Sequence, residues 1–182
     1  MGMAAPLYYS AADVRALPED GHRYEVVHGE LLVTPAPRLM HQEVVARLLV
    51  ALRRYLQDEP VGHALVAPAD ISWGSDTLVQ PDVFVVPLEQ ARTLDWTRIE
   101  HLLLVAEVLS PSSARADRFT KRVEYQRRRV PLYWIVDLDD RRVEVWAPDD
   151  AAPRLDRTRL IWRPEGAVRP FSLDLEVLFE PL

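Results

Sequence analysis

Two acidic residues lie in apolar surroundings, where an ionised carboxylate is costly. Glu107 stands near the end of the apolar run 101–109, and Asp82 directly precedes the apolar stretch 83–86. A carboxylate in such a place must be paired, protonated or bound to a cation. If the two segments are neighbouring strands, both carboxylates meet at one strand end. A divalent cation would then relieve the repulsion between them.

The ligand type favours a hard cation. Carboxylate oxygens suit Mg²⁺ or Mn²⁺, which bind one or two carboxylates and complete their shell with water and substrate phosphate. The alternative is that Asp82 and Glu107 cap loops or pair with arginines. A zinc site is not expected, because the histidine spacing does not suit one. The histidines concerned are His22, His28, His63 and His101.

A single lysine is the third candidate. Of 22 basic residues, 21 are arginine and one is Lys121. An ammonium group can change its pKa or act as a compact point charge, which a guanidinium cannot do. On a basic helix that follows the 101–109 strand, Lys121 could orient an attacking water or stabilise charge on a phosphate. The alternative is a surface salt bridge with Asp117, which contributes little.

Helical patterns come first among the elements that must position these residues. Apolar side chains recur at helical spacing over about 41–58, and Ser10 begins a short helix that ends before Pro18. The basic helix should span about 114–129, after the cap at 110–113. One of its faces carries Asp117, Lys121, Glu124, Tyr125 and Arg128. The apolar residues Phe119, Val123 and Val130 are expected to pack on the sheet.

Extended patterns supply the rest of the fold. Two strands joined through His28-Gly29 are predicted over 24–33, and others lie at 61–67, 69–73, 83–86, 101–109, 132–136 and 143–146. A strand is expected near Leu160 and a short apolar element over 173–179. Trp134 should be a core residue and Glu30 a turn or edge residue. We expect one mixed α/β domain over residues 1–182.

Composition limits the class of protein. Apolar residues make up 48% and charged residues 27%, as in soluble globular proteins. No apolar run has the roughly 18 to 20 residues of a membrane span, and residues 1–6 do not resemble a signal peptide. The chain has no cysteine, so a cytoplasmic location is expected.

Charge is unevenly distributed. The net charge of −6 argues against a nucleic-acid partner. However, residues 115–129 hold seven basic and two acidic residues, a local charge of +5 that leaves −11 elsewhere. This segment could follow a phosphate backbone or be a solvated helix face.

Several motifs together resemble a known family. They are Pro81-Asp82, the run 107–112 (EVLSPS), Asp117, Lys121, Tyr125 and the run 133–137 (YWIVD), with 24–30 (YEVVHGE) and His41 nearer the N-terminus. The pattern is similar to the Uma-two family of restriction endonuclease-like proteins, in the PD-(D/E)XK nuclease superfamily. The similarity runs from about Leu7 to Leu178.

The resemblance implies a restriction-endonuclease-like α/β fold, a mixed central sheet flanked by helices with extra N-terminal and C-terminal strands. Asp82 and Glu107 match the metal ligands of such nucleases, and Glu25 matches an additional acid. The motif lysine should stand two residues after the glutamate, where this chain has Leu109. Alternation puts Leu109 on the face of Glu107. Lys121 therefore resembles a lysine supplied from the following helix.

The predicted function is a Mg²⁺- or Mn²⁺-dependent endonuclease that hydrolyses phosphodiester bonds in DNA, with a homodimer suited to cutting both strands. The arginines at 115, 118, 122 and 127–129 are candidates for holding the backbone. His41 could contact phosphate or the site acids, or be structural. One alternative is a catalytically inactive nuclease-fold protein that binds nucleic acid or acts as an accessory module. Another is a protein whose groove is completed by a partner subunit.

Overall fold

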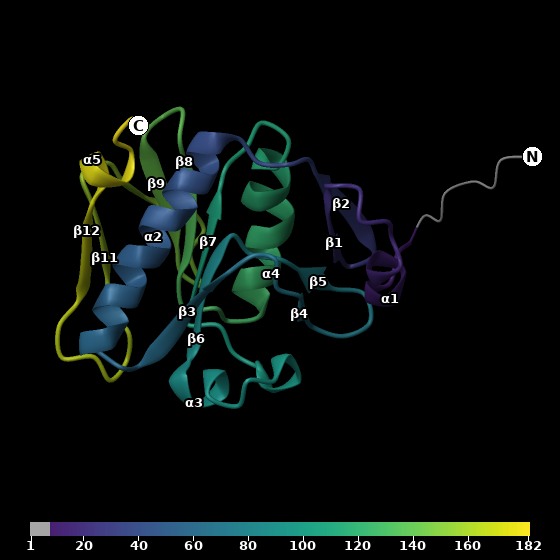
Figure 1. Ribbon diagram of the computed structural model, residues 1–182, viewed down its shortest axis with the longest axis horizontal. Helices are drawn as coiled ribbons and strands as arrows, with labels where there is room; N and C mark the ends of the chain where they lie inside the picture. The colour runs from purple at the N-terminus through teal and green to yellow at the C-terminus, as the bar shows by residue number, and fades with distance from the viewer. Residues whose placement is uncertain (1–7) are drawn as a thin grey trace, which may run out of the picture.

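The computed structural model describes residues 8–182 and is built around a six-stranded mixed sheet (Figure 1). Its strand order is β10-β9-β8-β7-β6-β3. The strands are β3 (Gly62–Val66), β6 (Val83–Pro87), β7 (Leu104–Val108), β8 (Tyr133–Asp137), β9 (Arg142–Trp146) and β10 (Arg154–Asp156). β7 and β8 run parallel, and the other neighbours in this sheet are antiparallel. The predicted mixed central sheet is confirmed.

Extra strands from the N-terminal and C-terminal parts form two further sheets, as expected. The N-terminal part forms a second sheet of order β2-β1-β5-β4. Its elements are α1 (Ala11–Arg15), β1 (Arg23–Val27), β2 (Glu30–Thr34), β4 (Ile71–Ser72) and β5 (Leu78–Val79). Of these, β4 and β5 lie between β3 and β6 in the chain. β1 and β2 are joined through His28 and Gly29, whose φ angles are 51° and 82°. Two residues of positive φ make the tight hairpin turn that matches strand twist.

The C-terminal part adds β11 (Arg159–Trp162), β12 (Phe171–Asp174) and α5 (Leu175–Leu178). β11 contains Leu160, as predicted, and the apolar element expected over 173–179 divides between β12 and α5. The segment between β6 and β7 forms α3 (Leu88–Ala91) and the 3₁₀ helix η1 (Trp96–Arg98), which were not predicted. The strand expected over 101–109 begins only at Leu104.

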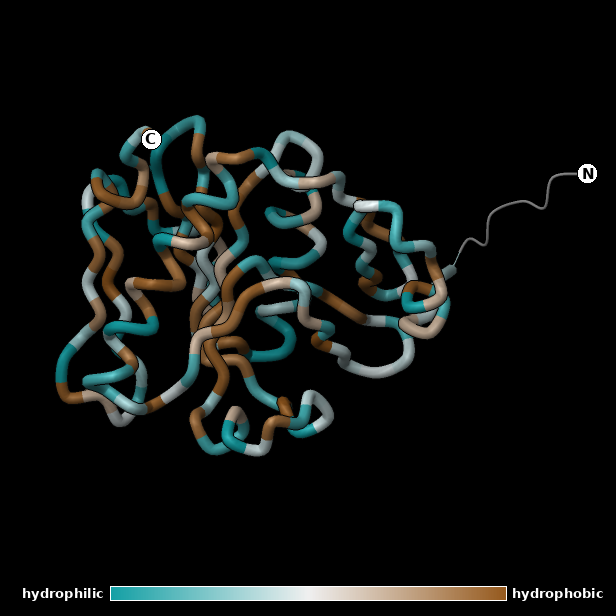
Figure 2. Tube along the Cα trace, in the orientation of Figure 1, coloured by the Kyte–Doolittle hydropathy of each residue, from teal (hydrophilic) through white to brown (hydrophobic). Residues whose placement is uncertain are grey.

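The long helix α2 (Leu39–Asp58) covers one face of the central sheet. Val44, Leu48 and Leu52 recur at helical spacing and are fully buried. They pack in one cluster with Val83, Val85, Leu104, Ala106, Val108 and Trp134, all from the same sheet face. Figure 2 shows this continuous apolar centre as brown strands. Trp134 is a core residue, as predicted.

The opposite sheet face is covered by the connection from β7 to β8, which parallel strands require. This connection contains the π-helical segment η2 (Ala116–Lys121) and α4 (Arg122–Arg127). Tyr125 and Val130 pack there with Phe84, Val105 and Ile135.

The prediction that Phe119 and Val123 pack on the sheet was wrong. Phe119 is 62% exposed and Val123 50% exposed, whereas Val130 is buried as expected. The helix turns its charged face inward because buried acids of the sheet pair with it. In consequence Asp117, Lys121 and Glu124 are buried in place of the apolar pair.

Among the helices of residues 8–182, none combines the length and the apolar character that a membrane span requires. The expectation that residues 1–6 are not a signal peptide concerns a segment that lies outside the described part, as does Leu7. The organisation as one domain over 1–182 stays a prediction.

Packing of α2 predicts the effect of two substitutions on this helix. Leu48→Ala should lower the free energy of unfolding by about 2–5 kcal/mol, because it leaves a cavity under a fully buried side chain. Val50→Ala should change it by about 0.5 kcal/mol or less, because Val50 is 65% exposed. Urea unfolding measures both; equal effects would contradict this packing.

Candidate active site

Asp82 and Glu107 lie side by side because β6 and β7 are antiparallel neighbours, as the sequence argument required. Val83 opposes Ala106 in the register of the two strands. The Asp82 N–H donates to Glu107 Oε2 at 3.3 Å, and the Val108 N–H donates to Asp82 Oδ2 at 2.8 Å. Asp82 is 3% exposed and Glu107 is fully buried. Two carboxylates thus meet at one end of these two neighbouring strands.

Lys121 reaches this pair from η2. Its Nζ donates to Glu107 Oε1 at 3.1 Å, and the Tyr125 hydroxyl donates to the same oxygen at 3.0 Å. Nζ also lies 3.3 Å from Asp117 Oδ1. Lys121 is 1% exposed. Sequence alone allowed a surface salt bridge between Lys121 and Asp117. The two residues do pair, but they do so in the interior of the protein.

The third acid predicted from sequence joins the same group. Glu25 Oε2 lies 2.8 Å from Lys121 Nζ, as an ion pair without hydrogen-bond alignment. The Gln80 N–H donates to Glu25 Oε1 at 2.7 Å, which ties β1 to the segment leading into β6. Glu25 is fully buried. The N-terminal sheet thus contributes a carboxylate to the site.

A π-turn sets the position of Lys121 and Asp117. The Arg122 N–H donates to the Asp117 carbonyl five residues earlier, and the Tyr133 hydroxyl donates to that carbonyl at 3.0 Å. Such turns within α-helices often occur at functional sites. The wider turn buries Asp117 and Lys121 together.

Leu109 lies where the family motif has its lysine. Val105, Glu107 and Leu109 alternate onto one face of β7, and Leu109 packs against the cluster that contains Tyr125 and Tyr133. This position points into an apolar layer. The ammonium near the acids therefore comes from η2.

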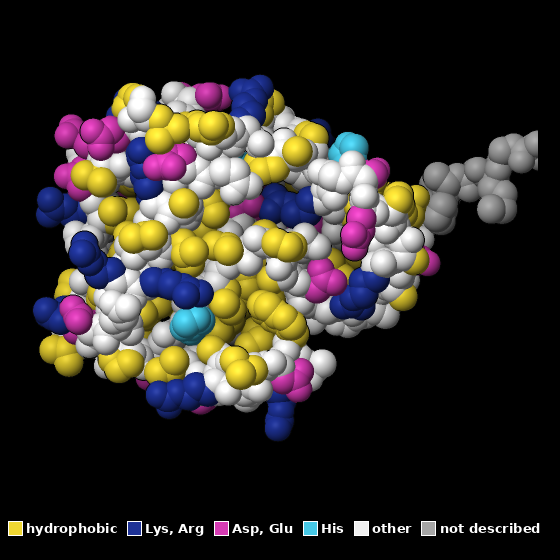
Figure 3. Space-filling model, viewed as in Figure 1, with side chains coloured by type: hydrophobic (Ala, Val, Ile, Leu, Met, Phe, Trp, Pro, Cys, Tyr) yellow, Lys and Arg dark blue, Asp and Glu magenta, His cyan; other side chains and the backbone are white. Residues whose placement is uncertain are grey.

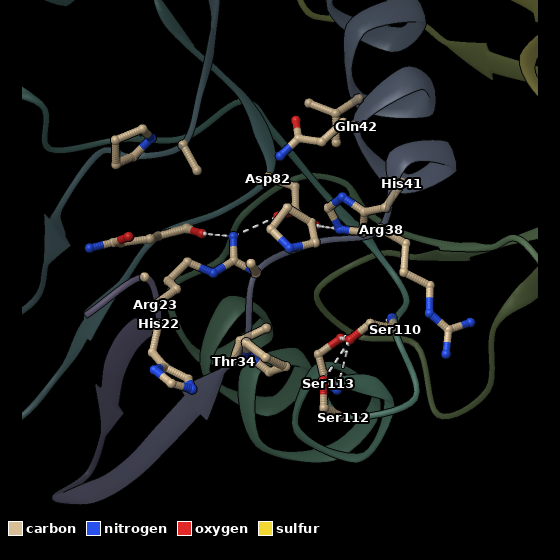
Figure 4. Close-up of a pocket in the computed structure, with 18 of the residues that line it drawn as sticks. His22, Arg23, Thr34, Arg38, His41, Gln42, Asp82, Ser110, Ser112 and Ser113 are labelled. Atoms are coloured by element: carbon tan, nitrogen blue, oxygen red, sulfur yellow. Dashed lines mark hydrogen bonds and ion pairs between the residues drawn. The ribbon is translucent and has the colours of Figure 1, made fainter. Parts of the chain in front are cut away.

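Arg23 and His41 complete the surroundings of Asp82 (Figure 4). Arg23 Nη1 donates to Asp82 Oδ1 at 2.6 Å and to the Gln80 carbonyl at 3.1 Å. His41 Nε2 lies 3.2 Å from Asp82 Oδ2. Of the interpretations left open for His41, contact with a site acid is observed. Sequence reasoning missed Arg23, although alternation along β1 puts Arg23 and Glu25 on one face.

Charge balance tests whether these residues fit a divalent cation. Four carboxylates, those of Glu25, Asp82, Glu107 and Asp117, face two permanent cations, Arg23 and Lys121. The excess of acid and the oxygen donors fit such a cation. In residues 8–182, no group of three or more His, Cys, Asp or Glu side chains is arranged to bind metal. Mg²⁺ can bind through one or two carboxylates and keep several waters.

Burial and neighbouring charges separate the pKa values of the two central acids. Burial raises the pKa of Glu107 to about 8; Lys121 opposes the shift, and Asp82 and Asp117 add to it. Burial would also raise the pKa of Asp82, but His41 and Arg23 hold it well below its ordinary value. Glu107 is thus the weaker acid of the pair and Asp82 the stronger.

The two ends of the site border different cavities. A cavity of about 620 Å³ is lined by Asp82, Arg23 and His41, together with the segments 34–38, 67–68 and 110–113. A smaller cavity of about 130 Å³ is lined by Glu25, Asp117 and Lys121. The larger cavity thus reaches Asp82 and the smaller one reaches Glu25, Asp117 and Lys121, whereas Glu107 lines neither.

Most arginines of the basic helix already have partners. Arg118 binds Glu144 at 2.8 Å and Asp137 at 2.7 Å. Arg128 binds Glu124 at 2.6 Å, and Arg129 pairs with Asp149. Arg122 lies over the ring of Trp146, Arg127 lies 3.6 Å from Glu124, and Arg115 is exposed. That these arginines hold a phosphate backbone stays a prediction.

The raised pKa of Glu107 predicts how stability depends on pH without metal. Between about pH 4.5 and 8 the folded state holds a proton that the unfolded state has released. Stability should therefore fall as pH rises through this window, by up to about 1.4 kcal/mol per pH unit. Glu107→Gln should flatten the slope, whereas Glu180→Gln, at an exposed position, should not.

Urea unfolding in EDTA at a series of pH values measures this slope. Burial also raises the pKa of Asp117, so that group adds to the loss from about pH 3.8 upward. A slope identical in the parent protein and in Glu107→Gln would contradict the assignment.

Comparisons with known proteins agree with this architecture. The solved structure of a protein described as a putative nuclease belonging to DUF820, from Anabaena variabilis ATCC 29413, matches with a TM-score of 0.77 and 17% sequence identity. The match covers 94% of this chain and 97% of that chain; at this identity it shows the shared fold. No curated protein matches the chain. A model of the Uma2 family, described as "Putative restriction endonuclease", matches residues 11–176, and the chain therefore belongs to the Uma2 family.

Proposed function

We propose that this chain is a divalent-metal-dependent endonuclease that hydrolyses phosphodiester bonds in DNA. The observation that carries the proposal is the contact of Lys121 with Glu107, beside Asp82, at the end of two neighbouring strands. This juxtaposition restores the two acids and the lysine of a nuclease motif, although the motif position itself holds Leu109. Family membership supports the same reading.

Asp82 and Glu107 are the residues that would hold the cation. Bound there, Mg²⁺ or Mn²⁺ would lower the pKa of a water and offset charge on the phosphate. Deprotonated Glu107 is needed for this, and a nearby cation favours that form against burial. Asp82 is held ionised by Arg23 and His41.

Lys121 acts as a permanent cation in this proposal. Burial alone would lower the pKa of Lys121, but Glu107, Glu25 and Asp117 raise it well above its ordinary value. An ammonium of raised pKa is a poor general base. Its role is to position a water and to stabilise negative charge that develops on the phosphate. Glu25 and Asp117 position the ammonium for this role.

The proposal predicts which substitutions abolish cleavage. Asp82→Asn and Glu107→Gln preserve shape and should each lower kcat at least about 100-fold, because each removes a charge that holds the cation. Lys121→Met should lower kcat by a similar factor. Asp149→Asn, which removes a surface acid paired with Arg129, should leave kcat unchanged.

Cleavage of plasmid and labelled oligonucleotides with Mg²⁺ or Mn²⁺ measures these effects, and circular dichroism verifies that each variant folds. Bound cation should also raise the Tm of the parent protein. If no substrate is cut and neither cation changes the Tm, the chain is instead a non-catalytic nuclease-fold protein. Sedimentation with and without DNA tests the expected homodimer.

A further inference from the structure

We infer that the cavity beside Asp82 binds an unpaired polynucleotide strand, a single strand or a frayed end, in preference to an intact duplex. The inference rests on the proposed nuclease function and adds its substrate class. It is carried by the depth of the acids, the shape of the cavity that reaches them, and the distribution of positive charge.

The reacting groups lie below the surface. Glu107 and Glu25 are fully buried, Lys121 is 1% exposed and Asp82 is 3% exposed. Of these groups only Asp82 lines the 620 Å³ cavity, whose rim also includes Glu19, so a phosphate must enter this cavity to meet Asp82. In an intact duplex each phosphate is held to a paired, stacked strand. An unpaired nucleotide can leave the stack and enter a recess.

The cavity has the size and composition of a site for a small polar group. Its volume falls within the range of about 300–1,000 Å³ typical of small-ligand sites. Pro35, Pro37, Pro68 and Pro111 form apolar walls, which suit the faces of a base or sugar. Hydroxyl, amide and cationic groups, including Thr34, Gln42, Ser112 and Arg38, lie between them.

Arg38 is the cation available to a phosphate at this cavity. It is exposed at the N-cap of α2, and in residues 8–182 no acidic side chain pairs with it. Figure 4 shows Arg23 and His41 directed at Asp82, whereas Arg38 extends away from it. Arg23 therefore pairs with Asp82, whereas Arg38 can bind a phosphate of the entering strand.

Three arginines of the basic helix are already neutralised by acids, which weakens that helix as a track for a duplex. Arg118, Arg128 and Arg129 are paired with acids of this chain, and the net charge is −6. On the face in Figure 3, basic side chains are interspersed with acidic and apolar ones. A protein that follows a duplex neutralises about six to ten phosphates. The basic side chains that line the cavity, Arg38 and Arg23 with His22 and His41, suit two or three phosphates at most.

The salt dependence of binding reports how many phosphates the protein neutralises, and it therefore tests this number. The probes are a fluorescent single-stranded DNA of about twelve nucleotides, the same sequence as RNA, the blunt DNA duplex, and that duplex with a single-stranded overhang. Anisotropy with the full-length Glu107→Gln protein in Mg²⁺ gives Kd without cleavage. We expect single-stranded and overhang probes to bind at least about tenfold tighter than the blunt duplex, with a log–log salt slope of about −1.5 to −2.

Two arginines on the same helix give a matched pair of variants. Arg38→Ala should weaken single-strand binding about fivefold or more and reduce the magnitude of the salt slope by about 0.7. Arg54→Ala removes an exposed charge about 24 Å further along α2. At that separation its charge is screened from the cavity, so binding should not change.

Several results would overturn the inference: blunt duplex bound as tightly as single strand, a slope of about −5 or steeper, or equal effects of Arg38→Ala and Arg54→Ala. The DNA and RNA probes identify which strand is preferred. If the parent protein cuts the duplex preferentially, the nuclease proposal stands and this inference fails. If single strands bind as expected but nothing is cut, the binding site stands and the nuclease proposal fails.

Discussion

One buried ammonium group holds three parts of this protein together. Lys121 from η2 meets Glu25 from β1, Glu107 from β7 and Asp117 from its own helix. Buried charges are stable only when their partners compensate for the water they lose. The N-terminal sheet, the central sheet and the crossover helix must therefore be docked before the charges are satisfied. The same contacts assemble the candidate active site.

The excess of acid around Lys121 links stability with function. A protein selected for stability alone would gain by replacing such a cluster with apolar side chains. Here the acids exceed the permanent cations, and burial raises the pKa of Glu107. Tyr125 holds the same Glu107 oxygen from the helix. The site is thus pre-arranged, with more acids than permanent cations, and this excess is what the proposed divalent cation would offset.

The lysine beside Glu107 comes from the helix that follows β7 and not from β7 itself. On β7, alternation would place a lysine at position 109 beside Glu107, but that position packs against Tyr125 and Tyr133. The π-turn and the bond from Tyr133 to the Asp117 carbonyl bring an ammonium to the same acid from the following element. The helix face that does this is charged and buried, which leaves Phe119 and Val123 in solvent.

Local sequence predicted most of the elements and singled out the central residues. Apolar periodicity predicted α2, apolar runs predicted β6 and β7, and a carboxylate in each run identified Asp82 and Glu107 because burial without a partner is costly. Because Lys121 is the one lysine among 22 basic residues, composition indicated a special role for it. Tertiary structure alone decided the partners. Arg23 and Asp82 are separated by 59 residues, and His41 reaches Asp82 from α2. Local periodicity carries no information about such contacts, since they depend on how sheets and helices dock.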